Sequence, residues 1–410
     1  MTRPGPAPTR SRQHPRLPAT GAAGQVVAVL RAAGPMTRGD LGHAMGLSRT
    51  TVSSTVARLK QDGWVDERPG SVSAYVRGRP PMLLSLTGQA GVAVGVDLGR
   101  THARIVVAHL GHDVVAEKAF ELDENWHGTQ AVDAVRAMIT ELLVSAEVTL
   151  ADVVGVGLGL PAPLDTTGHT TSQTIPPGWV LEDLPGALGQ SLGVPVAVDN
   201  DANLGALAEA RWGGGRRTGT LFYVKASTGI GAGIVLGGRL YRGSGGTAGE
   251  LGHVTVDADG LVCRCGSRGC LEVRVGGPAL VAQVGHSRAG IRTLTDLISA
   301  AQGGDLACTR VLADAGETLG VAVAAVLNIL NPDRVVLGGE LGEAGELVLA
   351  SLRESVGRHA LSSAVRSTSL TQATLGRRAE ALGAVLLVLT EAERFAEGPR
   401  PPGRRRPAAG

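Results

Sequence analysis

The chain has 410 residues, which is enough for two or three domains, and 43% of them are hydrophobic. Only 2% are aromatic, so a core must consist mainly of Val, Leu, Ala and Ile. No uninterrupted apolar run approaches the roughly 18 residues that span a bilayer, and the Pro- and Arg-rich start lacks the apolar segment of a signal peptide. We therefore expect a cytoplasmic protein with no membrane partner.

The net charge of +2 conceals an uneven distribution of charged residues. Residues 1–87 carry 12 Lys or Arg against 4 Asp or Glu, and residues 394–410 carry 5 Arg against one Glu. Residues 88–393 therefore have a net charge of −10. A basic first part on an acidic body predicts that the first part binds a polyanion and the body binds something else. The aperiodic ends, residues 1–21 and 394–410, predict a disordered basic arm and a disordered basic tail.

Residues 22–87 predict a small helical domain that ends in a hairpin. A first helix contains residues 26–30, and a second runs from Arg38 to Met45 and ends at Gly46. Ser48 stands at the N-cap position of a third helix, Arg49 to Gln61, which stops at Gly63. A strand begins at Trp64, and the stretch from Arg68 to Arg79 is expected to return as a wing.

The third helix has one apolar stripe, formed by Val52, Val56 and Leu59 at helical spacing. Its other side is short, polar and cationic, which suits base edges and phosphates in a major groove. A three-helix bundle with a solvated face is the alternative, but the short Gly46-Leu47 turn, the hydroxyl-rich third helix and the basic wing argue against it. This segment resembles the winged helix-turn-helix of bacterial repressors. The residues predicted to contact DNA are Ser48, Arg49, Thr50, Thr51, Ser53, Ser54, Arg58, Arg77 and Arg79.

Three of the four cysteines lie in one nine-residue run, 263–271, just after Gly249-Glu250-Leu251-Gly252-His253. Three thiolates and one imidazole are what a closed tetrahedral zinc site requires, so we predict structural zinc on His253, Cys263, Cys265 and Cys270. A disulfide cluster is the alternative, but neighbouring thiols would close a small strained ring. The carboxylates of Glu250 and Glu272 bracket the predicted metal site.

Residues 91–393 alternate β-branched runs with Ala- and Leu-rich stretches, which predicts an α/β body. The run 92–101 looks like the start of a dinucleotide-binding motif, but a second strand, 103–108, follows it instead of a helix. The Rossmann fingerprint needs a helix there, so we exclude it. A hairpin whose Gly/Thr turn faces a phosphate fits better and is similar to the phosphate loop of actin-like sugar kinases.

Several motifs in this body resemble the ROK family, which groups sugar-responsive repressors with sugar kinases. They are Asp97-Leu98-Gly99-Arg100-Thr101, the Gly-rich segment 154–163, Asp199-Asn200-Asp201-Ala202-Asn203, Ser227-Thr228-Gly229-Ile230-Gly231, the zinc cluster and the segment 331–339. The resemblance implies a winged helix-turn-helix joined to a two-lobed actin-like (ribonuclease H-like) ATPase/sugar-kinase fold with a zinc loop. It implies a first α/β lobe at 91–200, completed by a helix near 379–393, and a second lobe at 201–378.

The resemblance also implies a sugar site in the cleft between the lobes. The residues it assigns to the sugar are Asn200, Asp201, Glu250, His253 and Glu272. In a kinase, Asp201 would be the general base. The alternative is structural: Asn200 and Asp201 could cap the helix that follows them, and Glu250 could pair with Arg242.

The predicted nucleotide side departs from the kinase pattern. Arg100 stands for the second Gly of Asp-x-Gly-Gly-Thr-Lys, His102 stands for its Lys, and Ser227 replaces the first Gly of Gly-Thr-Gly. Phosphoryl transfer depends on charges placed around the phosphates, so these changes disfavour it. Binding of ATP and magnesium therefore stays open. The residues that would hold a nucleotide are Asp97, Gly99, Thr101, Thr228, Gly229 and Gly339.

We therefore expect a sugar-responsive transcriptional repressor. A sugar or sugar phosphate would close the two lobes, reorient the DNA-binding domains and lower operator affinity. Half-sites one helical turn apart imply a homodimer or homotetramer. An ATP-dependent hexose kinase that uses Asp201 remains the alternative.

Overall fold

The computed structural model describes residues 18, 20–70, 81–99, 102–122, 129–170 and 183–390. It divides into two compact units: residues up to 92 together with 108–113, and residues 93–107 together with those from 114 onward. The predicted basic tail and nearly all of the predicted basic arm lie outside the described residues. The first helix already begins at Gly21, the residue at which the arm was expected to end.

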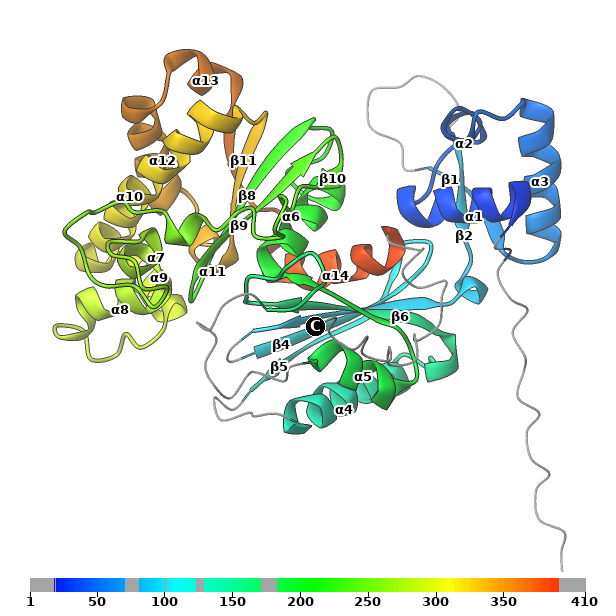
Figure 1. The fold of residues 1–410 in the computed structure, drawn as a ribbon, viewed down its shortest axis with the longest axis horizontal. Coiled ribbons are helices and arrows are strands. Elements are labelled where there is room, and N and C mark those ends of the chain that lie inside the picture. The colour runs from blue at the N-terminus through cyan, green and yellow to red at the C-terminus, as the bar shows by residue number, and fades with distance from the viewer. Residues whose placement is uncertain are drawn as a thin grey trace, which may run out of the picture. The chain divides into compact units, whose positions relative to one another are not determined.

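In its described residues, the first unit contains three α-helices and a two-stranded sheet (Figure 1). The predicted second and third helices have the expected bounds. The third helix is capped by the Ser48 hydroxyl, which accepts a hydrogen bond from the backbone N–H of Thr51 at 3.2 Å. Capping residues next to the helices in the sequence therefore set where the second and third helices begin. The elements are α1 (Gly21–Ala33), α2 (Arg38–Met45), α3 (Arg49–Gln61), β1 (Val65–Pro69) and β2 (Met82–Leu86).

The prediction for the wing was wrong in its return strand. Arg68 lies on β1, opposite Leu83 of β2, so the chain returns at 82–86 and not between 68 and 79. The reason is burial: Leu84 and Leu86 lie on the buried side of β2, with the partly exposed Ser85 between them, and are 0% and 3% exposed. Met36 also forms a bridge to Leu84. Residues 71–80 lie outside the described part of the chain.

The second unit contains two five-stranded sheets with the same topology. Their strand orders are β5-β4-β3-β6-β7 and β10-β9-β8-β11-β12. In each sheet a three-strand meander is followed by two crossover strands, so the order 3-2-1-4-5 occurs twice. This duplication agrees with the actin-like fold expected. The strands of the first sheet are β3 (Val92–Leu98), β4 (His102–His109), β5 (Val114–Glu121), β6 (Val153–Leu160) and β7 (Val196–Asn200).

The second sheet repeats this arrangement. Its β8 and β9 are antiparallel, whereas β8 and β11 are parallel. The β8–β9 turn at 227–229 is thus the counterpart of the β3–β4 turn that begins at Gly99. Its strands are β8 (Thr220–Ala226), β9 (Ile230–Leu236), β10 (Arg239–Leu240), β11 (Arg334–Gly338) and β12 (Ser369–Gln372).

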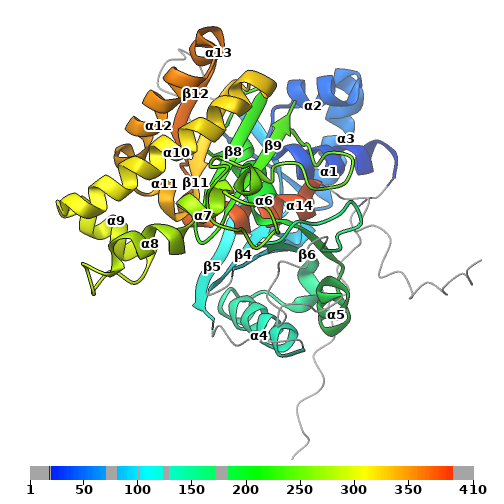
Figure 2. The same ribbon diagram turned by 60° about the vertical axis from the view of Figure 1, so that its left-hand side comes forward.

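Two helices lie between the sheets, α6 (Asp201–Trp212) and α14 (Ala379–Thr390). Both views place them there (Figures 1 and 2), and each contacts strands of the sheet on its own side and the other helix. Their backbones approach closely at Gly383, where a Cβ would lie 1.9 Å from the carbonyl oxygen of Leu204. The helix predicted near 379–393 corresponds to α14 over residues 379–390, and it packs against the second lobe's α6 as well as the first lobe's β6; residues 391–393 lie outside the described part of the chain.

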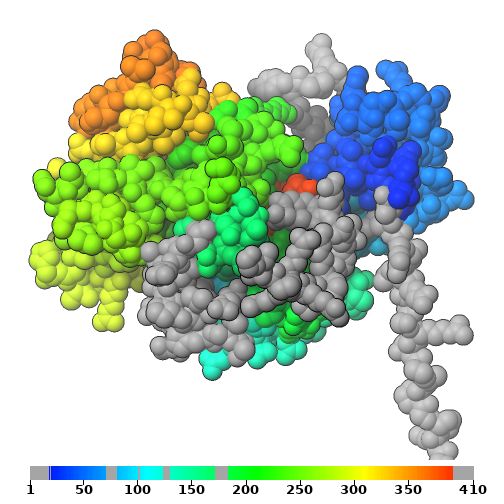
Figure 3. Space-filling model, in the orientation of Figure 1, coloured from blue at the N-terminus to red at the C-terminus, as the bar shows by residue number. Residues whose placement is uncertain are grey.

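Remaining helices cover the outer faces of the two sheets. In the second lobe, α10 packs against α12 and α9 around a large apolar core, and this lobe forms a closely packed surface (Figure 3). Among the described residues, α10 alone is long and apolar enough to cross a membrane, but half of its most apolar stretch is buried inside the protein. It is thus a core helix. The bounds are α4 (Thr129–Ser145), α5 (Leu184–Leu192), α7 (Leu271–Val275), α8 (Gly277–Gly285), α9 (Leu294–Gln302), α10 (Leu306–Leu330), α11 (Gly339–Gly342), α12 (Glu346–His359) and α13 (Ser362–Ser367).

Candidate functional site

Helix α3 presents the predicted DNA-contacting residues to solvent. Its buried side consists of Val52, Thr55, Val56 and Leu59. Every described residue that was predicted to contact DNA is exposed: Ser48, Arg49, Thr50, Thr51, Ser53, Ser54 and Arg58. Arg77 and Arg79 lie outside the described residues. The exposed side of α3 therefore has the donors and positive charges that a DNA groove requires.

The helix-turn-helix is fixed to its wing by one carboxylate. Arg38 of α2 donates from Nε and Nη2 to the two oxygens of Glu67 on β1, at 3.1 and 2.9 Å. Lys60 of α3 also reaches Glu67, at 3.1 Å. These contacts engage Arg38 and Lys60 and do not involve Arg49 or Arg58, which lie on the exposed side of α3.

The predicted metal ligands come together in the loop between β10 and α7. The ligand atoms of His253, Cys263, Cys265 and Cys270 all lie within 4.8 Å of one another. The Cys265 and Cys270 sulfurs are 3.6 Å apart, and the Cys263 sulfur lies 3.7 Å from His253 Nδ1. Metal–sulfur bonds of about 2.3 Å in a tetrahedron place neighbouring sulfurs about 3.8 Å apart. The cluster thus has the dimensions of a tetrahedral metal site.

All four cysteines lie in the part of the chain that the structure describes, and each is a free thiol. The disulfide alternative is therefore wrong for this structure. The imidazole of His253 connects the cluster to the carboxylates, because its Nδ1 faces Cys263 while its Nε2 lies 3.9 Å from Glu250. One histidine can thus hold a metal through one nitrogen and orient a neighbouring carboxylate through the other.

The two carboxylates that bracket the cluster have different surroundings. Glu272 follows Cys270 at the start of α7; its Oε2 accepts from the backbone N–H of Ile230 at 3.1 Å, and Arg264 pairs with its Oε1 at 3.0 Å. Burial and, to a smaller extent, the negative charges of Asp201 and Glu272 together raise the pKa of Glu250 to about 7. Three of the predicted sugar-binding carboxylates, Asp201, Glu250 and Glu272, are therefore close enough for two of them to shift the pKa of the third.

Asn200 has the capping role that was the structural alternative. Its Oδ1 accepts from the backbone N–H groups of Ala202 and Asn203 at 2.9 and 3.3 Å, and its Nδ2 donates to the carbonyl of Ala162 at 3.0 Å. One amide N–H therefore remains for a ligand. Helix α6 begins at Asp201, one residue before the expected Ala202.

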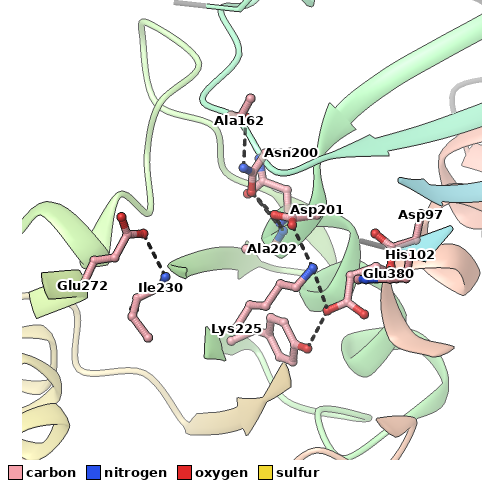
Figure 4. A network of polar contacts seen from close by, with 12 residues as sticks. Asp97, His102, Ala162, Asn200, Asp201, Ala202, Lys225, Ile230, Glu272 and Glu380 are labelled. Atoms are coloured by element: carbon pink, nitrogen blue, oxygen red, sulfur yellow. Dashed lines mark hydrogen bonds and ion pairs between the residues drawn. The ribbon is translucent and has the colours of Figure 1, made fainter. Parts of the chain in front are cut away.

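Asp201 is buried and held by a lysine that sequence analysis missed. Its Oδ2 accepts from Lys225 Nζ at 2.7 Å, and its Oδ1 accepts from the backbone N–H of Ala202, also at 2.7 Å. Lys225 lies on β8 and reaches Glu380 of α14 at 3.8 Å, while the Tyr223 hydroxyl donates to Glu380 at 3.1 Å (Figure 4). A lysine within the buried run 221–226 was the available signal, but it does not identify its partners.

Most described residues of the predicted nucleotide side are closely surrounded by other groups. Asp97 is 2% exposed, and its Oδ2 lies 3.3 Å from His102 Nε2. The imidazole ring of His102 lies over Gly99. A Cβ at Gly229 would lie 2.7 Å from the carboxylate of Glu272, so this glycine makes room for that side chain. Thr228 is exposed, Gly339 adopts a φ of +69° against the backbone of Ala226, and Thr101 lies outside the described residues.

Arg242 pairs with Asp199: its Nε donates to Oδ2 at 2.7 Å. Asn203 Nδ2 donates to the other carboxylate oxygen at 2.9 Å. This ion pair joins the end of β7 in the first lobe to the segment after β10 in the second, and was not predicted. Sequence analysis had considered Arg242 only as a partner for Glu250.

The buried Glu380 predicts a pH dependence of stability. Its pKa is raised to about 7, first by burial, which the positive charge of Lys225 opposes and to which the carboxylates of Asp97 and Asp201 add. The folded state therefore holds this proton more tightly than the unfolded state, so Glu380 lowers stability increasingly as pH rises from about 4.5 to 7. We expect Glu380→Gln to remove that loss, worth up to about 3 kcal/mol, in urea unfolding at pH 5 and pH 8. Equal pH profiles for the variant and the wild type would contradict this.

Comparisons with known proteins agree with both units. The ROK family profile matches residues 93–391, and a MarR family profile matches residues 19–71. The xylose repressor of Bacillus subtilis (strain 168) is 30% identical over 358 residues, 87% of this chain and 91% of that protein. The Streptomyces griseus ROK glucokinase solved with glucose and AMPPNP is 29% identical, with a TM-score of 0.64 over 72% of this chain and 99% of that one.

One solved structure is similar along nearly the whole chain. It is a ROK family transcriptional regulator described as a homologue of the E. coli MLC protein, with 25% identity and a TM-score of 0.72. The similarity covers 90% of this chain and 95% of that chain, and so includes a DNA-binding unit as well as the two lobes. With a family profile that spans most of its length and these relatives, the chain belongs to the ROK family.

Proposed function

We propose that this protein is a transcriptional repressor that releases operator DNA when a sugar or sugar phosphate binds between its two lobes. The observation that carries the proposal is that one chain contains both an α3 surface with exposed cations and a cluster of carboxylates, Asp201, Glu250 and Glu272. Similarity to a xylose repressor and to a ROK transcriptional regulator supports it. Operator DNA and the sugar are thus the two partners, in the cytoplasm.

The proposed sugar contacts are Asp201, Glu250, His253 and Glu272, with one N–H of Asn200. A sugar presents neighbouring hydroxyl groups, and carboxylates accept hydrogen bonds from such pairs. The influence of Asp201 and Glu272 on Glu250 supports a common site, because carboxylates brought together in a partly buried place need a partner that donates hydrogen bonds.

We propose zinc as the ion of the His253, Cys263, Cys265 and Cys270 cluster. Thiolate and imidazole ligands with tetrahedral dimensions suit zinc, and four protein ligands leave no open position for water. The ion would therefore be structural. Its role would be to hold Glu250 and Glu272, which neighbour its ligands in sequence, at the edge of the sugar site.

A mutation of the exposed cations of α3 tests the DNA-binding part. We expect Arg49→Ala and Arg58→Ala each to lower DNA affinity about tenfold, since a phosphate or base contact is worth about 1–3 kcal/mol. If the arginine contacts phosphate, the slope of log affinity against log salt should also fall by about 0.9. The measurement is fluorescence anisotropy on DNA selected from a random pool. Arg310→Ala, at an arginine that is 77% exposed on α10, is the control and should change neither quantity; if it matches Arg49→Ala, α3 is not the DNA-binding surface.

A panel of sugars separates a regulator from a kinase. The panel should contain xylose, glucose, N-acetylglucosamine and their phosphates, each with and without ATP and magnesium. A regulator should show an increase in melting temperature with at least one sugar and no ATP consumption. Turnover above about 1 per second would instead indicate a kinase, because typical kinase rates begin there. Absence of any sugar-dependent shift would contradict the proposed sugar site.

We also propose that the protein binds DNA as a homodimer or homotetramer. Helix-turn-helix proteins read two half-sites about one helical turn apart, which requires two copies of α3. Light scattering in the presence of selected DNA would test this, and one chain per DNA site would contradict it.

A further inference from the structure

Lys225 is a largely buried cation beside the proposed sugar site, and it is not one of the proposed sugar contacts. It lies on β8 between buried neighbours, Val224 and Ala226, and its own side chain is only 13% exposed. Buried lysines are rare unless they are paired, because removing an ammonium group from water is costly. Lys225 must therefore be held by the negative groups around it.

Three carboxylates from three separate elements surround this ammonium group. Asp201 of α6 accepts its hydrogen bond at 2.7 Å, and Glu380 of α14 lies at 3.8 Å. Asp97 of β3 is close enough that Lys225 is the largest influence lowering its pKa, against the opposing effect of burial. Figure 4 shows Lys225 pointing toward Asp201 and Glu380, with Asp97 beyond Glu380.

The two aspartates are the ones that phosphoryl transfer would need. A kinase requires a carboxylate that holds a divalent cation and a base that is free to take the proton of the attacking hydroxyl. Here both oxygens of Asp201 already accept hydrogen bonds, one of them from Lys225. Asp97 is buried, and its Oδ1 has no hydrogen-bond partner among the described residues, so it remains a free acceptor beside the ammonium group.

We infer that Lys225 takes the place of the divalent cation in this cleft, and that it thereby makes the site a sugar-binding site without phosphoryl transfer. One ammonium group neutralises part of the charge of Asp97, Asp201 and Glu380. A divalent cation would have to enter next to it, against its repulsion. The residues present therefore do not fit the magnesium ion that a kinase of this fold would use. The inference deepens the proposed function, since it explains how a sugar cleft persists without the reaction.

The test replaces the ammonium group with an apolar side chain of similar length. Lys225→Met leaves three carboxylates together without a cation, so we expect it to bind one additional Mn²⁺ per chain, counted by electron paramagnetic resonance. Millimolar MnCl2 should also raise its melting temperature by about 5 °C or more. The wild type and Lys225→Arg should show neither effect. Lys118→Met, at a lysine whose side chain is 47% exposed, is the matched control and should behave as the wild type.

A second variant covers the case in which Lys225→Met does not fold. Lys225→Met/Glu380→Gln removes one of the carboxylates as well and keeps Asp97 and Asp201, so it should fold and still take up Mn²⁺. Mn²⁺ uptake equal to that of the wild type in the folded variants would overturn the inference. So would a failure of both variants to fold in the presence of Mn²⁺, because the ion is inferred to replace the ammonium group. The proposed sugar site is tested separately by the sugar-dependent melting shift, which needs no Mn²⁺ and is measured on the wild type.

Discussion

Cys263→Ser should abolish metal binding and disorganise the sugar site. Cys263 is buried and its sulfur lies 3.7 Å from His253 Nδ1, so its removal leaves three ligands where four form a closed site. If free zinc exceeds its dissociation constant about a thousandfold, loss of the ion costs about 4 kcal/mol of stability. Metal analysis should fall from one zinc per chain to nearly none, and melting temperature should fall with it.

The sugar site should fail together with the metal site. Glu250 and Glu272 are three and two residues from the ligands His253 and Cys270, so the loop that holds the ion also positions both carboxylates. We therefore expect no sugar-dependent melting shift in Cys263→Ser. Cys308→Ser is the matched control, because Cys308 is equally buried but lies on α10 away from the cluster. Unchanged zinc content in Cys263→Ser, or an equal loss in Cys308→Ser, would refute the assignment.

Asp201→Asn should have the second large effect, on both stability and ligand binding. It removes the charged partner that lies 2.7 Å from Lys225 Nζ, and the side chains of this pair are only 11% and 13% exposed. Breaking a buried ion pair costs about 3–5 kcal/mol, because the remaining charge stays buried. Urea unfolding should show this loss, and calorimetry should show no sugar binding.

A double-mutant cycle separates the two effects. In Asp201→Asn/Lys225→Met the ammonium group that lost its closest partner is removed as well, so part of the stability should return, whereas sugar binding should stay lost. Lys118→Met serves again as a control for an exposed lysine. If the double variant is as unstable as the sum of the single variants, the ion pair does not stabilise the fold as described.

Sequence signals that act over short distances predicted the structure well. Thr37 and Ser48 cap the starts of α2 and α3, and the glycines at 46 and 63 follow their ends. Each of these signals lies within a few residues of the helix boundary that it marks. The His/Cys cluster was predicted because three of its four residues lie within eight residues of one another, and the structure brings all four together. The hairpin 92–109 was identified because a second strand follows its turn immediately.

Interactions between distant segments could not be predicted in the same way. The return strand of the wing depends on pairing between β1 and a segment more than ten residues further along the chain. That segment, 82–86, pairs with β1 and buries Leu84 and Leu86. Lys225 and Glu380 are 155 positions apart and meet only because α14 packs beside α6 between the sheets. Sequence could show that each is a charge in an apolar run, but not that they share one site.

The most direct test of the account is the affinity of the full-length protein for its selected DNA with and without the sugar that raises its melting temperature. A repressor whose cleft controls its DNA-binding unit should lose at least tenfold in affinity at saturating sugar, a coupling of about 1.4 kcal/mol. Cys263→Ser should bind the same DNA and not respond. A sugar that binds the wild type but leaves its DNA affinity unchanged would contradict the account.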